Sequence, residues 1–181
     1  MFARTERLLL RPAWPEDAGA LASALADARV ARMLARIPHP YTLDHAVART
    51  LEPRAAHEPR FLIDSLESGT PVLVGGIGIA DRCGEGPQFH YWLTPAAWGR
   101  GYATEAGRAV IAMARHALPL ARLGAWHFAD NPASGKVLRK LGFRPTGTMM
   151  QRPSAARSDS ASSIEYVLDL DVERCPVLIA A

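Results

Sequence analysis

The fold is decided by the stretch Trp98-Gly99-Arg100-Gly101-Tyr102-Ala103-Thr104. A short apolar run from Phe89 to Leu93 precedes it, and an amphipathic pattern over 104–117 follows it. This order predicts a strand, a glycine turn and a helix. The two glycines allow backbone conformations that other residues avoid, so several N–H groups can point into one concavity at the helix N-terminus. Because amides and the helix dipole there favour an anion, the stretch predicts a cradle for phosphate or pyrophosphate.

The helix after the turn has one apolar face, made by Ala103, Ala106, Ala109, Val110, Met113 and Ala117. Thr104 is expected to cap this helix, and Glu105 suits its first turn. An ordinary glycine-containing turn would show the same pattern, so the turn alone does not establish an anion site. Two known phosphate loops are excluded, because the chain has neither G-x-x-x-x-G-K-[ST] nor G-x-G-x-x-G followed by an acidic residue about twenty positions on.

The motif W-G-R-G-Y-A-T-E-A resembles the acyl-coenzyme A pyrophosphate loop, [QR]-x-x-G-x-[GA], of the GNAT superfamily of N-acetyltransferases. Three further blocks, 91–95, 131–143 and 5–12, are similar to the ribosomal-protein N-terminal acetyltransferase branch of that superfamily. With a weaker match at 37–42, the resemblance covers residues 5 to about 148. We therefore expect an acetyl-CoA-dependent N-acetyltransferase of this branch.

The resemblance implies an α/β fold with one GNAT-type domain over 1–170 and a tail over 171–181. Its elements should follow the order β-α-α-β-β-β-α-β-α-β-β, giving a mixed sheet with helices on both faces and two splayed central strands. The residue patterns place strands at 7–11, 61–66, 72–80, 88–93, 123–128, 143–150 and 164–170. The tail carries an apolar run, 177–179, which is expected either to pack on the domain or to pair with a second subunit in a homodimer.

By the same resemblance, acetyl-CoA is the acetyl donor, and its pantetheine arm lies between the splayed strands. Leu93 matches the position whose main chain pairs with that arm. Asn131 and Ser134 match residues that reach the pantetheine and the sulfur, and Asn131 is also expected to cap the helix that starts at Pro132. The amides matched to the pyrophosphate are those of Arg100, Gly101, Tyr102, Ala103 and Thr104.

Acetyl transfer to an amine requires a group that accepts the amine proton and a donor to the leaving thiolate. Ser134 matches the donor proposed for the branch, whereas Leu138 stands where other members carry a tyrosine. Gln88 stands where many relatives have a basic glutamate, and His90, on the same strand face, is our candidate base. A structural hydrogen bond is the alternative role for His90. Because Gln88 and Leu138 cannot do this chemistry, a catalytically weak acyl-CoA-binding module is the alternative function.

The acceptor pocket is expected between the first helices, the 38–42 segment and the late hairpin. Tyr41 and Trp92 are our candidates to line it, with Trp14, Met33 and Met149 as further aromatic or apolar side chains. The branch resemblance implies a protein or peptide N-terminus as acceptor. A small-molecule amine such as a polyamine, an amino acid or a drug remains open.

Composition agrees with a cytoplasmic globular protein. The chain has 181 residues, 49% of them hydrophobic, which supplies a core for one domain. It contains no apolar run of the roughly 18–20 residues that cross a bilayer and no signal-peptide pattern.

Cys83 and Cys175 form no Cys-x-x-Cys pair, and the six histidines lack ligand spacing, so we expect no metal. The net charge of +3 comes from scattered arginines, so we expect no nucleic-acid partner.

Overall fold

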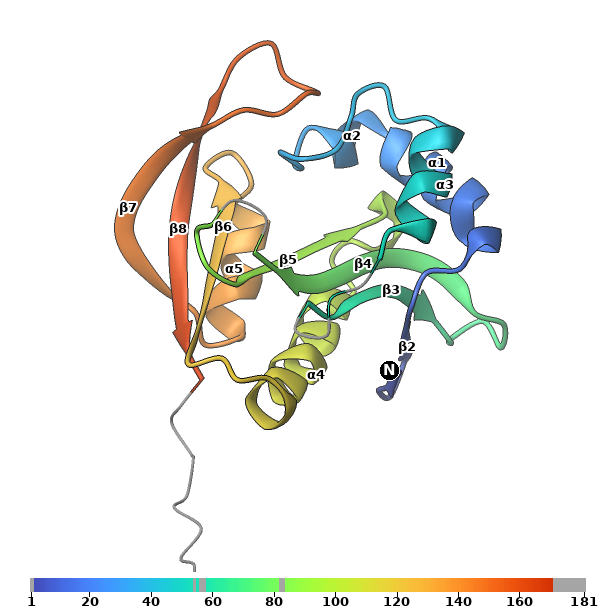
Figure 1. The fold of residues 1–181 in the computed structure, drawn as a ribbon, viewed down its shortest axis with the longest axis horizontal. Helices are drawn as coiled ribbons and strands as arrows, with labels where there is room; N and C mark the ends of the chain where they lie inside the picture. The colour runs from blue at the N-terminus through green and yellow to red at the C-terminus, as the bar shows by residue number, and fades with distance from the viewer. Residues whose placement is uncertain (1, 54, 56–57, 82–83, 171–181) are drawn as a thin grey trace, which may run out of the picture.

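The computed structural model describes residues 2–53, 55, 58–81 and 84–170 (Figure 1). Within them, one eight-stranded sheet has the strand order β1-β2-β3-β4-β5-β6-β8-β7. The strands are β1 (Ala3–Arg4), β2 (Leu8–Arg11), β3 (Arg60–Ser65), β4 (Val72–Ala80), β5 (Gln88–Leu93), β6 (Arg122–Phe128), β7 (Arg144–Arg152) and β8 (Ala161–Asp169). Neighbouring strands are antiparallel except β5 and β6, which are parallel. The expected mixed sheet is confirmed.

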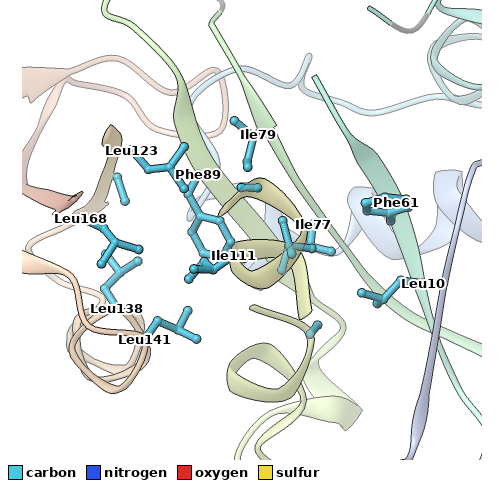
Figure 2. Packing of buried hydrophobic residues seen from close by; sticks show 14 of the residues in the cluster. Leu10, Phe61, Ile77, Ile79, Phe89, Ile111, Leu123, Leu138, Leu141 and Leu168 are labelled. Atoms are coloured by element: carbon cyan, nitrogen blue, oxygen red, sulfur yellow. The ribbon is translucent and has the colours of Figure 1, made fainter. Parts of the chain in front are cut away.

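Helices cover both faces of the sheet. They are α1 (Ala18–Ala26), α2 (Ala28–Ala31), α3 (Leu43–Leu51), α4 (Tyr102–Ala117) and α5 (Pro132–Lys140), with short 3-10 turns at Pro15–Asp17 and Pro95–Ala97. Strand alternation divides the core between these layers. Phe61 and Ile63 of β3 pack with α4 and α5, whereas Leu62 packs with α1, α2 and α3. Figure 2 shows the first cluster, in which Ile77 and Phe89 of the sheet lie against Ile111 of α4.

The structure differs from the sequence-based expectation at several element boundaries. A short additional strand, β1, pairs with β2, and the region before β3 holds three helices where the expected order had two. Helix α4 begins at Tyr102, so Thr104 lies inside its first turn and does not cap it. Gly101 occupies the N-cap position with φ +83°, a left-handed conformation that glycine adopts without strain. The proposed tail 171–181, with its 177–179 run, and both cysteines lie outside the described residues.

A buried ion-pair network fastens α1 to the sheet. Arg11 of β2 donates to Asp64 of β3 at 2.6 Å and to both carboxylate oxygens of Asp17, at 2.7 and 2.8 Å, just before α1. Burial raises the pKa of Asp64, and Arg11 opposes that rise. Burial also works against ionisation of Asp17, but hydrogen bonds from Arg11 and from the Trp14 amide leave its pKa lowered. Both carboxylates therefore depend on Arg11 for their charge balance.

Candidate active site

The central strands β5 and β6 separate almost as soon as they meet. Gln88 opposite Gly124 is their one paired position among the described residues, and the Gly124 amide donates to the Pro87 carbonyl at 2.9 Å. Beyond this point β5 continues to pair with β4 as far as Leu93, and β6 pairs with β8. A cavity of about 560 Å³ occupies this region, bordered by both strands and by α4 and α5. The splayed arrangement inferred from the sequence is present.

The glycine turn opens onto this cavity at the N-terminus of α4. Gly99 and Gly101 have φ values of +75° and +83°, which only glycine adopts readily. The amides of Thr104 and Glu105 donate to the Gly101 carbonyl at 3.1 Å each. The amides of Tyr102 and Ala103 precede them at the open end of the helix, where no earlier helical carbonyl exists. Of the five amides expected to bind pyrophosphate, the Thr104 amide therefore already has an acceptor.

The side chains of Arg100 and Tyr102 hold the turn in place through Glu67. The Arg100 guanidinium pairs with Glu67 at 2.5 Å and lies over the Tyr102 ring at 5.0 Å. The Tyr102 phenol is buried, donates to Glu67, and lies 3.2 Å from the Ser65 hydroxyl. Arg100 is not among the residues that border the cavity, although Gly101, Tyr102, Ala103 and Thr104 are. Any contact of Arg100 with pyrophosphate is therefore left to its main chain.

Glu105 ties the first turn of α4 to the turn between β1 and β2. It accepts hydrogen bonds from the Thr5 hydroxyl at 2.6 Å, the Arg7 amide at 3.0 Å and the Arg7 guanidinium. Burial works against its ionisation, but these bonds prevail and its pKa is lowered. Arg7 also donates to the Arg100 carbonyl at 3.0 Å. The sequence predicted Glu105 in the first turn, and the structure adds its long-range partners.

Leu93 borders the cavity at the end of β5, as its predicted role requires. Its carbonyl already accepts a hydrogen bond from the Trp98 indole N–H at 3.0 Å. The glycine turn and the end of β5 are therefore joined directly. This contact leaves the Leu93 amide as the group that its expected pairing with pantetheine would use.

Asn131 and Ser134 lie together at the start of α5. The Asn131 side chain accepts from the Ser134 amide at 3.3 Å, which confirms the predicted cap. The Ser134 hydroxyl lies 2.8 Å from the phenol oxygen of Tyr91, which reaches it from β5. Burial raises the pKa of Tyr91 to about 12, against the opposing effect of the Ser134 hydrogen bond. The phenol therefore stays protonated at neutral pH.

Tyr91 is the polar residue of this site that the sequence reasoning missed. Leu138, which stands where the resemblance implies a tyrosine, is buried in the main hydrophobic cluster. A tyrosine hydroxyl nevertheless reaches the start of α5, from the neighbouring strand. The alternation of β5 was the available signal, because Phe89, Tyr91 and Leu93 share the face that packs against α4 and α5.

The opposite face of β5 carries Gln88, His90 and Trp92, which also border the cavity. Glycines of β4 make room for two of them. Gly76 is paired with Trp92, and Gly78 with His90. A Cβ at Gly76 would lie 2.5 Å from the indole nitrogen, and one at Gly78 would lie 3.2 Å from the imidazole Cε1. Predicted residues His90 and Trp92 thus reach the cavity from the face that α1–α3 cover, opposite Tyr91 and Ser134.

Tyr41, by contrast, does not border the cavity. Its ring is 6% exposed and packs in the second hydrophobic cluster with Ala46 and Leu62. Thr42 caps α3 by accepting from the His45 amide, and the residue before this cap points inward. The expectation that Tyr41 lines the acceptor pocket is therefore corrected. Of the further candidates, Met33 borders the cavity, whereas Trp14 and Met149 do not.

The described residues also bear on metal sites and membrane spans. No group of three or more His, Cys, Asp or Glu side chains is placed to hold a metal ion within this part of the chain. None of the described helices has the length and apolarity needed to span a bilayer.

Comparison with known proteins identifies the family. The family described as "Acetyltransferase (GNAT) domain" matches residues 7–144. The chain is 30% identical over 152 residues to the uncharacterized N-acetyltransferase YoaA of Bacillus subtilis (strain 168), covering 81% of this chain and 85% of that protein.

Solved structures share the fold. A GNAT-family acetyltransferase from Bacillus anthracis superposes with a TM-score of 0.79 at 22% identity, covering 94% of this chain and 99% of that one. RimL, a ribosomal L7/L12 alpha-N-protein acetyltransferase solved with coenzyme A, gives 0.80 at 18% identity, covering 96% and 100%. The glycine turn, the splayed strands and these matches lead to one conclusion: the chain belongs to the GNAT family of acetyltransferases and is an acyltransferase.

Proposed function

We propose that this enzyme transfers an acetyl group directly from acetyl-CoA to a primary amine. The observation that carries the proposal is the separation of β5 from β6 after a single paired position, beside a glycine turn that opens the N-terminus of α4. The cavity so formed borders both the turn and the start of α5. Backbone amides at a helix N-terminus suit a pyrophosphate, and unpaired strand edges suit an amide-containing arm.

The residues present fit acetyl-CoA. A pyrophosphate would be held by the amides of Gly101, Tyr102 and Ala103, with those of Arg100 and Thr104 beside them. The main chain of Leu93 and the side chain of Asn131 would hold the pantetheine. Lys136 and Lys140 of α5 also border the cavity and supply positive charge toward the phosphates. Bound acetyl-CoA would supply the activated acetyl group and a thiolate leaving group.

Ser134 is our proposed donor to that thiolate, and Tyr91 is its positioning residue. A serine hydroxyl is a weak acid, so it acts here by hydrogen bonding. Either hydroxyl can donate in this contact, and we assign the donor role to the Tyr91 phenol, which would leave the serine proton free to point into the cavity. One residue of β5 and one of α5 would thereby share the donor role toward the thiolate that a single tyrosine on α5 has elsewhere in the superfamily.

His90 is our proposed acceptor of the amine proton, directly or through water. It borders the cavity from the α1–α3 face, opposite the Tyr91–Ser134 pair. An acceptor amine entering from that side would lie between the two groups, which is the order that direct transfer needs. Gln88, two residues earlier on the same face, offers no basic group.

The acceptor amine is a protein N-terminus or a small molecule. The three sequence blocks shared with the ribosomal-protein N-terminal acetyltransferase branch favour the first, and Trp92 on the cavity wall would contact either. We further propose a cytoplasmic location, a domain over 1–170 followed by a tail over 171–181, and a homodimer. The family assignment does not favour a catalytically weak binding module.

The test is an amine and peptide screen with acetyl-CoA, read by release of free thiol and by product mass. We expect thiol release that depends on the acceptor, together with a mass gain of one acetyl group on the amine. Saturable acetyl-CoA binding without turnover on any acceptor would favour the binding module and contradict the enzyme.

A further inference from the structure

The charges that border the cavity have one sign. Among the described residues, the charged side chains on its wall are Arg36, Arg49, Lys136 and Lys140, and none is a carboxylate. The two lysines belong to α5, on the side proposed for the CoA phosphates. The two arginines come from α3 and the segment before it, on the acceptor side. Arg49 is paired with Glu52 at 3.6 Å, so Arg36 supplies the positive charge on the acceptor side that the cofactor does not account for.

The carboxylate nearest to Arg36 is bound mainly by another arginine. Glu85 is held by Arg152, whose two terminal nitrogens reach its two oxygens at 3.2 and 3.1 Å. Arg36 approaches the same carboxylate only to 3.8 Å, beyond normal hydrogen-bond length. Its side chain is 31% exposed, so its donors keep the freedom to meet a ligand. A guanidinium binds carboxylate or phosphate in forked geometry.

The remaining acceptor wall is apolar and aromatic. Met33, Ile37 and Trp92 border it from the α1–α3 side, and Trp126 borders it from β6. Arg152 lies over the Trp126 ring at 4.6 Å, so the indole is fixed from outside. An apolar body of modest size would fit against these walls.

The β7–β8 loop contacts the segment that carries Arg36. Ser154 donates to the Leu34 carbonyl at 2.7 Å, and Arg157 donates to the Arg32 carbonyl at 2.8 Å. In Figure 1 this loop arches from the β7–β8 hairpin toward α2. The contact therefore holds in place the segment from which Met33, Arg36 and Ile37 border the cavity.

We infer that the preferred acceptor is an amine that carries an anionic group on an apolar body, with Arg36 as the anion-binding residue. This inference rests on the proposed acetyltransferase function. The anion has two sources, the carboxylate of a free apolar amino acid or an acidic residue following a peptide N-terminus. Polyamines are disfavoured, because their extra ammonium groups would face cations with no carboxylate on the wall.

Paired acceptors that differ only in the charge test this inference. The first arm compares L-phenylalanine with L-phenylalaninamide, and the second compares C-terminally amidated peptides that begin Phe-Glu and Phe-Gln. Values of kcat/KM are expressed per neutral amine, because the two members of a pair differ in amine pKa. We expect the anionic member to be favoured at least about tenfold in one arm, the equivalent of one charge-assisted hydrogen bond. The arm that shows the preference identifies the source of the anion.

Variants at Arg36 then assign the preference to a residue. Arg36→Gln should lower kcat/KM for the anionic acceptor about tenfold and leave its uncharged partner within about twofold, and Arg36→Lys should restore part of the loss. Arg32→Gln is the matched control, because Arg32 lies in the same segment, is 54% exposed and does not border the cavity. It should leave the preference unchanged.

Three results would overturn the inference: equal rates within both pairs, faster acetylation of spermidine than of any anionic acceptor, or an equal loss for both members of a pair in Arg36→Gln. Each of these requires acetylation to be observed. A protein that acetylates nothing in the wider screen would instead contradict the proposed function itself.

Discussion

The two faces of β5 are built in different ways. On the α4–α5 face, the proposed cofactor site is mostly main chain from one continuous segment, 99–104, with a helix cap at Asn131. On the α1–α3 face, the proposed acceptor site is made of side chains drawn from several elements far apart in the sequence, among them Arg36, Trp92 and Trp126. Main-chain sites need particular backbone conformations, whereas side-chain sites need particular tertiary contacts. Local changes in the glycine turn should therefore disrupt the proposed cofactor site. Detachment of the α1–α3 helices should disrupt the proposed acceptor site.

The largest effect is expected where α1 is fastened to the sheet. Arg11→Met would leave Asp64, which is 1% exposed, as a buried carboxylate without its partner. Breaking a buried pair in this way costs about 3–5 kcal/mol. Urea denaturation should show this loss in the free energy of unfolding. Arg122→Met, at an exposed pair with Asp169, is the control and should cause no measurable loss.

The same variant separates the two faces. At a temperature where Arg11→Met remains folded, its Kd for acetyl-CoA should stay near the wild-type value while its KM for the acceptor rises. An equal weakening of both would show that the faces are coupled and would remove the basis of the comparison.

The next effect should arise in the glycine turn. Gly101→Glu forces a side chain onto a residue with φ +83° and places a carboxylate where pyrophosphate is proposed to bind. Calorimetric affinity for acetyl-CoA should fall at least about 100-fold, from combined repulsion and loss of amide geometry. Gly147→Glu is the matched control, because Gly147 has φ +85° and lies in β7, away from the cavity. That variant should bear a similar strain and bind acetyl-CoA normally.

These two faces also explain how far the sequence could predict the molecule. The glycine pair and the capping asparagine act through local backbone geometry, so their positions could be inferred from order and spacing alone. Tyr41 was misplaced, because whether an aromatic ring faces a cavity or a core depends on how α3 packs. Tyr91 was missed for a related reason: its partner Ser134 lies 43 positions away and meets it only through the fold. Arg36 had no recognisable motif at all.

A smaller effect is expected from the Tyr91–Ser134 pair. Ser134→Ala should lower kcat about tenfold or more, and Tyr91→Phe somewhat less, with little change in the KM for acetyl-CoA. If Tyr91 acts through Ser134, the double variant should be no slower than Ser134→Ala alone, so the losses are not additive. Rapid-quench measurements of the transfer step provide the values. Additive losses would assign Tyr91 a role independent of the serine.

The smallest effect concerns the tie between α4 and the β1–β2 turn. The pKa of Glu105 is lowered from its ordinary value of 4.5, because the hydrogen bonds from Thr5 and Arg7 outweigh its burial. A lowered folded-state pKa gives stability that is present above the unfolded-state pKa and is lost as pH falls through the folded-state value. Glu105→Gln should therefore be less stable than wild type by about 1 kcal/mol at pH 7, a modest figure because Arg7 is partly exposed. The difference between the two proteins should shrink as the pH falls below 4.5 and close once it passes the lowered folded-state pKa, since the protonated wild-type side chain then resembles glutamine. Urea denaturation between neutral and acid pH would reveal this convergence, and a difference that stays constant with pH would show that shape, not charge, makes the contact.

Because the tie also positions the Arg100 carbonyl through Arg7, acetyl-CoA affinity should weaken over the same pH range. An unchanged affinity would mean that the glycine turn keeps its geometry without support from β1 and β2.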